Sequence, residues 1–330
     1  MPYRLVEFTA TKEQVERASE ITKDFEPIQQ WTDILEDDKG RLNILTQVEK
    51  TEEMMDELTD KFSSEEGFRL MLFSVEATVP RPEDDEQEEK TEEDKKTSGR
   101  ISREELYNDI IEGSRLSKVY VATIILSVLV ATVGLINDNV AVIIGSMVIA
   151  PLLGPNVSFS LALTLGDLNL ARRSTITAGA GLLMGLVVSV LIGWFIDVDP
   201  QVGQIASRTV VGVGDIVVAL AAGSAGVLAY TRGISAAVIG VMVAVALLPP
   251  LANLGLLLGA GYWSLAFGTG VLLAVNLVCI NLAGIVTFLV QDIRPRTWWE
   301  EEKASKATRI ALGIWITLLA IFAMLIYFWF

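Results

Sequence analysis

Long apolar segments fill the C-terminal two-thirds of this chain of 330 residues. A helix needs about 20 apolar residues to cross a hydrocarbon layer of about 30 Å, and it satisfies its backbone hydrogen bonds internally. The pattern therefore predicts an α-helical polytopic membrane domain. We expect about seven spans, at residues 119–136, 139–165, 175–196, 214–231, 234–260, 265–290 and 309–329.

The first hundred residues have a different composition, with 28 Asp and Glu, 14 Lys and Arg, and only 3 of the 26 glycines. Residues 1–80 alternate strand-like and helix-like patterns in the order βαββαβ, which predicts an α+β ferredoxin-like domain. The N-terminal sequence lacks the apolar stretch of a signal peptide, so we expect this domain to be cytoplasmic. The fold leaves two roles open, a docking domain and a sensor of a small molecule.

Two segments connect this head to the first span. Residues 81–100 carry almost no apolar side chains, which predicts an acidic, flexible linker. Residues 101–118 return to helical spacing, with Leu106 and Ile110 on one side. This second segment is predicted to be an amphipathic helix at the inner membrane surface, followed by a membrane domain over residues 119–330.

The rarity of some residue types excludes several functions. The chain contains one cysteine, Cys279, and no histidine. A disulfide framework, a thiolate zinc site and Ser-His or Cys-His catalysis are therefore excluded within one chain. The acidic head is a poor match to nucleic acid, which binds basic surfaces. We expect no cofactor, no metal site and no enzymatic activity.

Lys and Arg are unevenly distributed over the loops. They precede the first span and follow the second, fourth and sixth, whereas the alternate loops hold only Arg208. Because positive residues stay inside, we expect a multi-pass plasma-membrane protein with a cytoplasmic N-terminus and an extracellular C-terminus. A charge cluster is predicted at the cytoplasmic surface, although topology alone also explains its arginines: Asp167, Arg172, Arg173 and Arg232.

Two apolar runs stop at prolines, AVIIGSMVIAPLLGP at 141–155 and AAVIGVMVAVALLPP at 236–250. An offset of 95 residues aligns Ile144-Gly145 with Ile239-Gly240 and Pro155 with Pro250. The match lies in the second and fifth spans, so the repeat unit is three spans long. An odd unit predicts inverted three-helix repeats with broken helices, at about 119–196 and 214–290, plus an extra span at 309–329.

A proline inside a membrane helix frees backbone carbonyls and amides, which are tolerated only against protein or a watery cavity. Two breaks at equivalent positions therefore favour a path for an ion or solute, although two structural kinks are the alternative. For Asn276 and Asn281, helix-to-helix bonding is a further alternative. The predicted path residues are Pro151, Gly154, Pro155, Asn156, Ser158, Pro249, Pro250, Asn253, Asn276 and Asn281.

One motif has the form of an enzyme signature. GVGD, residues 212–215, matches the GxGD of intramembrane aspartyl proteases. That chemistry needs two carboxylates at membrane depth. The only candidate partners of Asp215 are Asp197 and Asp199, and both are expected in an outer loop. We therefore rank an intramembrane aspartyl protease below the other functions.

The stretches DNVAVIIGSMVIAPLLGPN at 138–156, LGD at 165–167 and VIGVMVAVALLPPLANLG at 238–255 resemble a known family. It is the prokaryotic hydrophobic-domain membrane family called domain of unknown function 389. The resemblance covers roughly residues 100–290. It implies a bacterial or archaeal integral membrane protein and brings no catalytic residues with it.

The function predicted from these features is that of a transporter or channel-like protein for an ion or small polar solute, regulated by the cytoplasmic domain. The alternative is a membrane-bound receptor or assembly scaffold, whose head binds a small molecule or a protein and through which nothing passes. In both cases the expected partners are the lipid bilayer and further copies of the chain in a homo-oligomer.

Overall fold

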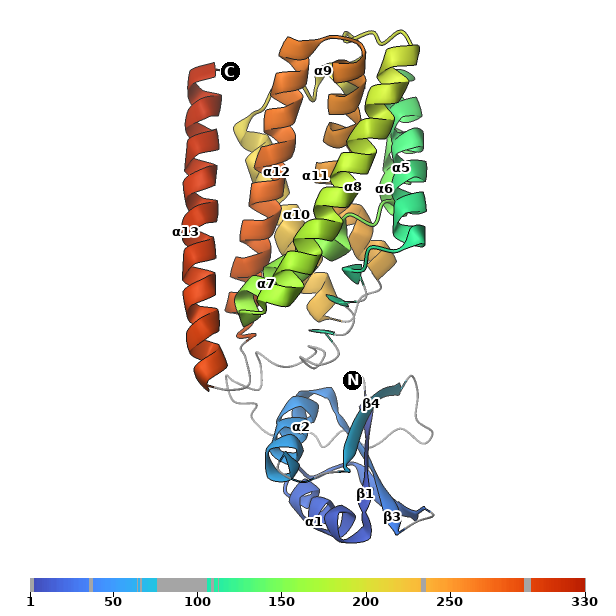
Figure 1. Ribbon diagram of the computed structural model, residues 1–330, viewed down its shortest axis with the longest axis vertical. Helices are drawn as coiled ribbons and strands as arrows, with labels where there is room; N and C mark the ends of the chain where they lie inside the picture. The colour runs from blue at the N-terminus through green and yellow to red at the C-terminus, as the bar shows by residue number, and fades with distance from the viewer. Residues whose placement is uncertain are drawn as a thin grey trace, which may run out of the picture. The chain divides into compact units, whose positions relative to one another are not determined.

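The computed structural model describes residues 3–35, 38–63, 65, 67–75, 106–107, 110–111, 113–232, 236–293 and 298–329. The chain divides into two compact units, Met1–Leu106 and Tyr107–Phe330, and Figure 1 shows a mixed sheet-and-helix part and a helical part. The predicted linker at 81–100 lies outside the described residues.

The N-terminal unit is a small antiparallel sheet with two helices. Its elements are β1 (Tyr3–Thr11), α1 (Lys12–Lys23), β2 (Gln29–Ile34), β3 (Lys39–Gln47), α2 (Val48–Phe62) and β4 (Arg69–Val75). The strands pair in the order β2-β3-β1-β4, and all three pairings are antiparallel. The element order is therefore the βαββαβ order that the sequence predicted.

The core of this unit lies between the helices and one face of the sheet. Val6 and Phe8 of β1 pack with Leu42 of β3, and α1 and α2 contribute Val15 and Leu58. Side chains alternate between the two faces of a strand, so both helices cover the same face. The helix α1 begins where expected, because the Thr11 hydroxyl accepts a hydrogen bond from the Gln14 amide (3.4 Å).

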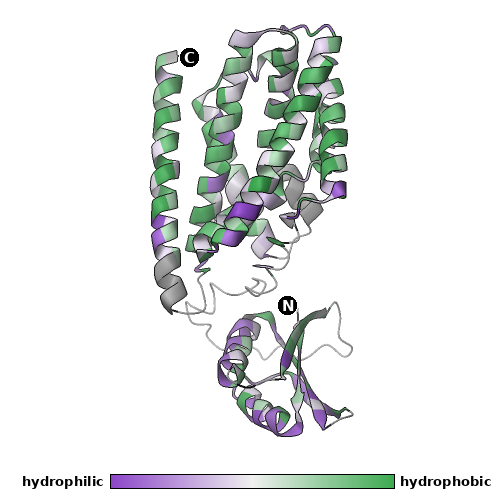
Figure 2. Ribbon diagram, in the orientation of Figure 1, coloured by the Kyte–Doolittle hydropathy of each residue, from purple (hydrophilic) through white to green (hydrophobic). Residues whose placement is uncertain are grey.

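The C-terminal unit is helical. Its helices are α5 (Lys118–Ile136), α6 (Val140–Ile149), α7 (Leu153–Leu165), α8 (Leu168–Phe195), α9 (Gly203–Ala206), α10 (Val213–Thr231), α11 (Ala236–Gly259), α12 (Trp263–Val290) and α13 (Trp298–Trp329). Figure 2 shows that these helices are largely apolar, whereas α1 and α2 are largely hydrophilic.

Five of the described helices are long and apolar enough to cross a membrane, namely α5, α8, α10, α12 and residues Ala304–Phe328 of α13. The bent pair α6–α7 is a sixth if it counts as one span. In α11, the segment Ala246–Gly259 is a further apolar stretch. These lengths and compositions are those of a multi-pass membrane protein.

The spans differ in how much protein surrounds them. The helix α12 is the most buried of the five, whereas α13 packs mainly along α7 and α12 and leaves most of its apolar surface exposed. The exposed side chains of α13 include Ile314, Ile321 and Met324. Apolar side chains on the outside of a bundle suit contact with lipid rather than water.

Glycines bring α8 and α11 into close contact. A Cβ added at Gly185 would lie 2.7 Å from the Leu251 side chain, and one added at Gly255 or Gly259 would collide with Ser189 or with the Val190 carbonyl oxygen. Small residues at such positions let two helix backbones approach closely. The two helices therefore pack at backbone distance.

Candidate functional site

The chain breaks between α6 and α7 because of a proline. Pro151 has no amide hydrogen to continue α6, and a residue that precedes proline is driven out of the helical conformation. Ala150 is accordingly extended, with ψ of 118°. The helix resumes at Leu153 after a bend of 54°. The interruption that the sequence predicted at Pro151–Asn156 is thus present, and it is centred on residues 150–152.

Two asparagines lie next to this break. The Asn156 side-chain amide donates a hydrogen bond to the Leu152 carbonyl (2.7 Å). The Asn281 amide of α12 donates to Asn156 Oδ1 (3.3 Å) and to the Leu277 carbonyl (2.8 Å). Both side chains are buried. The break therefore faces polar groups of α12 within the protein.

Serines extend the polar contacts of α7 to its two neighbours. Ser174 of α8 donates to the Ser158 hydroxyl (2.8 Å), and Ser160 donates to the Asn156 carbonyl (3.1 Å) and the Asn281 carbonyl (3.3 Å). Ser160 and Ser174 were not among the residues that the sequence predicted. Isolated hydroxyls in long apolar helices were the available signal for them.

The segment that precedes α5 covers the start of α7. A Cβ added at Gly154 would lie 2.5 Å from the Gly113 carbonyl oxygen, so the two backbones touch. Thr177 of α8 also donates to the Ser114 carbonyl (2.8 Å). Tyr107 and Ile111 pack against the cluster of Ala162, Leu170 and Ala171. Residues 107, 111, 113 and 114 of the predicted surface helix thus pack on the helical unit, whereas residues 115–118 are exposed.

The residues of the predicted charge cluster have separate environments. Asp167 caps α8 by accepting hydrogen bonds from the amides of Asn169 and Leu170 (both 3.0 Å), and it accepts one from the Tyr107 hydroxyl (2.7 Å). Burial of the ring, then this hydrogen bond and the Asp167 charge, raise the pKa of Tyr107 to about 12. Arg172, Arg173 and Arg232 are exposed, and the described residues contain no ion pair between them and Asp167.

The second proline pair does not break its helix, and this prediction was wrong. The helix α11 continues from Ala236 to Gly259 with Pro249 and Pro250 inside it. Pro250 cannot donate to the Ala246 carbonyl four residues earlier. The Asn276 amide of α12 donates to that carbonyl instead (2.7 Å). A side chain of the neighbouring helix thus replaces one hydrogen bond that proline removes.

Asn253 lies one turn beyond these prolines and is completely buried. Its side-chain amide donates to the Ile205 carbonyl of α9 (3.2 Å) and to the Thr269 hydroxyl of α12 (3.3 Å). Asn253 therefore joins three helices. It is not brought into the Asn156–Asn281 contact.

Three of these buried asparagines share a property that the sequence did not reveal. The Oδ1 atoms of Asn253, Asn276 and Asn281 accept no hydrogen bond from any part of the chain that the structure describes. A buried acceptor without a partner is destabilising by about 1–3 kcal/mol. Such atoms in a natural protein call for an explanation, and a bound water or ion is one.

The other candidate features have local explanations. Asp215 of the GxGD motif accepts a hydrogen bond from the Gly212 amide (2.8 Å) at the start of α10. Asp199 accepts one from the Gln201 amide (2.9 Å) in the preceding loop. The described residues contain no group of three Cys, Asp or Glu side chains arranged to hold a metal ion.

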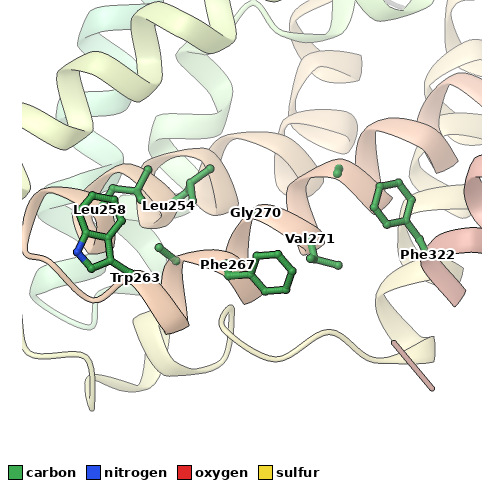
Figure 3. A pocket seen from close by; sticks show the side chains of 9 residues that line it. Leu254, Leu258, Trp263, Phe267, Gly270, Val271 and Phe322 are labelled. Carbon is green, nitrogen blue, oxygen red and sulfur yellow. The ribbon is translucent and has the colours of Figure 1, made fainter. Parts of the chain in front are cut away.

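A groove of about 400 Å³ lies between α11, α12 and α13. Figure 3 shows that its wall is formed by side chains such as Leu254, Phe267 and Phe322. No charged side chain lines it. This groove suits an acyl chain better than a polar solute, so the candidate site is the break and the asparagines around it.

Comparison with known proteins identifies the family of the chain. Residues 147–282 match the family described as Domain of unknown function (DUF389). The chain is 40% identical over 287 residues to the uncharacterized protein MJ0678 of Methanocaldococcus jannaschii, and the alignment covers 87% of each chain. No solved structure matches the chain. The matched residues run from the end of α6 through α11 to the middle of α12, and the chain belongs to the family of domain of unknown function 389.

Proposed function

We propose that this protein is a membrane transporter or channel-like protein for an ion or small polar solute. The single observation that carries the proposal is the break between α6 and α7, which is enclosed by protein and contacted by Asn156, whose side-chain oxygen accepts a hydrogen bond from Asn281. Backbone that is not helical at membrane depth is tolerated where it is buried in protein or lines a cavity. In transporters such breaks hold the substrate or the coupling ion.

The helix boundaries support a repeat of three spans. The offset of 95 residues converts the bounds of α5, Lys118–Ile136, into those of α10, Val213–Thr231. The same offset converts Leu168–Phe195 of α8 into Trp263–Val290 of α12. The middle element is α6–α7 in one copy and α11 in the other.

The contacts support the same repeat. The hydrogen bond between Ser158 and Ser174 has its equivalent between Asn253 and Thr269, each 95 residues later. Contacts between the copies also exchange: Ser160 lies against Gly284, and the equivalent Gly255 lies against Ser189. Exchange of this kind is what a two-fold relation between the copies predicts. Since each copy has three spans, the copies would have opposite orientations in the membrane.

We place the N-terminal unit in the cytoplasm and the C-terminus outside the plasma membrane, on the distribution of Lys and Arg over the loops. We also propose that the chain forms a homo-oligomer. The element order and strand order of the N-terminal unit support a ferredoxin-like regulatory domain. We also expect no enzymatic activity: the chain contains no histidine, and Asp215 of the GxGD motif accepts a hydrogen bond from the Gly212 amide.

Cysteine accessibility tests the proposed path. Ser146→Cys, Ser158→Cys and Ser160→Cys place small thiols on both sides of the break, and Cys279→Ser removes the native one. Ser127→Cys on α5 is the matched control, because Ser127 is equally buried and bonds only within its own helix. We expect a polar thiol reagent to modify at least one cysteine at the break and to spare the control. If none of the three reacts in native vesicles, the path is absent.

A second candidate function rests on the sheet of the head. Its face opposite α1 and α2 carries the half-exposed aromatic side chains Trp31 and Phe73, and the Glu7–Arg41 ion pair (3.1 Å) lies between them. An aromatic surface of this kind suits a receptor or an assembly scaffold. Trp31→Ser with Phe73→Ser would then change the oligomeric mass in detergent. Ile34→Ser, which is 80% exposed at the sheet edge, is the control.

A further inference from the structure

We propose that the solute is a monovalent cation that loses its water shell inside the protein. It would be held in succession by the side-chain oxygens of Asn253, Asn276 and Asn281, here called the amide oxygens. This inference rests on the proposed transport function and narrows it to one chemical class.

The orientation of the three amides is fixed by their partners. Each Nδ2 atom donates to a main-chain carbonyl: Ile205 for Asn253, Ala246 for Asn276 and Leu277 for Asn281. A carbonyl can only accept, so the nitrogen must point to it and the oxygen must point away. The unpaired atoms are therefore oxygens, whichever way an amide is first assigned.

All three side chains are at least nine-tenths buried. The unpaired atoms of these three side chains are acceptor oxygens, and among the described residues of Tyr107–Phe330 no buried side-chain N–H or O–H donor lacks a partner. A solute that satisfies only acceptors must offer positive charge or hydrogen-bond donors. An anion offers neither, and a neutral hydroxyl compound would bring acceptors of its own.

The charge of the surroundings narrows the class further. The fully buried polar side chains of this unit, among the residues described, are Ser, Thr and Asn. Calcium and magnesium sites use carboxylates, which are missing here. A monovalent cation needs only neutral oxygens, as in channel filters that replace its water with carbonyl groups. The carbonyl end of α6 at the break adds partial negative charge.

The three amides lie at different levels of α12, and Asn276 contacts α11 whereas Asn281 contacts α7. Asn253 contacts Thr269, and Asn276 and Asn281 follow seven and five residues later on the same helix. At 1.5 Å per residue, these levels are separated by about 10 Å and about 8 Å along the helix axis. One ion therefore cannot bind all three oxygens at once. The spacing suits successive positions across the middle of the unit.

The test uses the purified full chain in detergent and in lipid vesicles. Its melting temperature is measured in NaCl, KCl or RbCl and compared with that in choline chloride at equal ionic strength. Choline is the reference because it is too large to replace a small dehydrated cation beside a buried amide oxygen. Uptake of radioactive sodium and rubidium is measured in vesicles. We expect at least one alkali cation to raise the melting temperature saturably and to enter the vesicles.

Variants locate the effect. Asn276→Leu and Asn281→Leu should raise at least tenfold the cation concentration that gives half of the maximal rise in melting temperature. Thr287→Val is the matched control on α12, since its hydroxyl is buried and bonds only to Ala283 of its own helix. Asn276→Asp keeps one side-chain oxygen and replaces the Nδ2 donor with a second oxygen, so the group becomes titratable. Cation stabilisation should then depend on pH, which a role in helix packing would not produce.

The outcomes separate this inference from the proposed function. Transport of an anion or a neutral solute, without any alkali-specific stabilisation, would overturn the cation and leave the transporter. Absence of every flux together with unreactive cysteines at the break would overturn both. If Asn276→Leu does not fold, the wild-type measurements and Asn276→Asp still decide.

Discussion

The two proline-containing segments of the C-terminal unit, α6–α7 and α11, differ at the position of the break. The break between α6 and α7 is centred on Pro151, whereas α11 has Ala246 at the position 95 residues later and remains a helix. Both segments carry a proline at a second equivalent position, Pro155 in α7 and Pro250 in α11. The shared proline is thus compatible with a continuous helix, and the additional one coincides with the break.

The helix that packs beside each of these two segments also differs. Asn276 of α12 supplies a hydrogen bond to the Ala246 carbonyl. Its equivalent on α8 is Gly181, which the Tyr120 ring fills. The segment α6–α7 therefore has no side-chain amide at that position. What the comparison teaches is that α11 contains two prolines without a break, and that a side chain of the next helix supplies one of the missing hydrogen bonds.

The largest effect on stability is expected at the start of α7, where residue 113 lies against Gly154. Gly154→Leu would drive a side chain into the Gly113 backbone, which cannot turn aside. We expect a loss of about 3 kcal/mol or more, measured as a fall in thermal stability in detergent. Gly145→Ala is the control, because no atom lies within 4 Å of its added Cβ. Equal effects of the two changes would contradict the packing described here.

The next change introduces into α11 a proline equivalent to Pro151. Ala246→Pro should break α11 at the position equivalent to Pro151 and destabilise the protein by about 3 kcal/mol. Spin labels at the two ends of α11 would report the bend as a shorter distance. An unchanged distance would mean that Pro151 does not by itself cause the break.

A double-mutant cycle tests the replacement hydrogen bond. Asn276→Ala alone leaves the Ala246 carbonyl without its side-chain donor and should cost about 1–3 kcal/mol. In a Pro250→Ala background the backbone amide of residue 250 can donate instead, so the same substitution should cost less. We expect a coupling free energy of about 1 kcal/mol between the two positions. Additive effects would refute the replacement.

The smallest effect on stability is expected for Tyr107, in the segment that precedes α5. Tyr107→Phe removes the hydrogen bond to Asp167 and should cost about 1 kcal/mol near neutral pH. The raised pKa of about 12 means that this stability is present below the ordinary tyrosine pKa, near 10, and is lost as pH rises through 12. Thermal unfolding of both proteins from pH 8 to 12 would show their difference shrinking.

The helices were largely predictable because apolar length and turn residues are local properties. The α5, α10 and α12 segments begin within two residues of their predicted positions. The start of α8 was placed too late, since the Asp167 cap at residue 167 was not recognised. The element order of the head followed from alternation along the chain.

The environment of the site was less predictable. Pro250 looks like a breaker until α12 brings Asn276 to the orphaned carbonyl, and this contact joins residues that are 30 positions apart. The same holds for Gly113, whose contact with Gly154 depends on how the chain returns to α7. Periodicity reports which side of a helix is apolar. It does not report which polar atom on another helix answers a given carbonyl.

The glycine contacts between α8 and α11 have a consequence for how the unit holds together. Gly185, Gly255 and Gly259 have no rotamers to lose, so joining these two helices costs little side-chain entropy. The contacts of α7 with α12 instead fix Asn156, Asn281 and Ser160 in single rotamers. Thermal motion should therefore loosen the second contact before the first, and α8 with α11 should behave as the stiff axis of the protein.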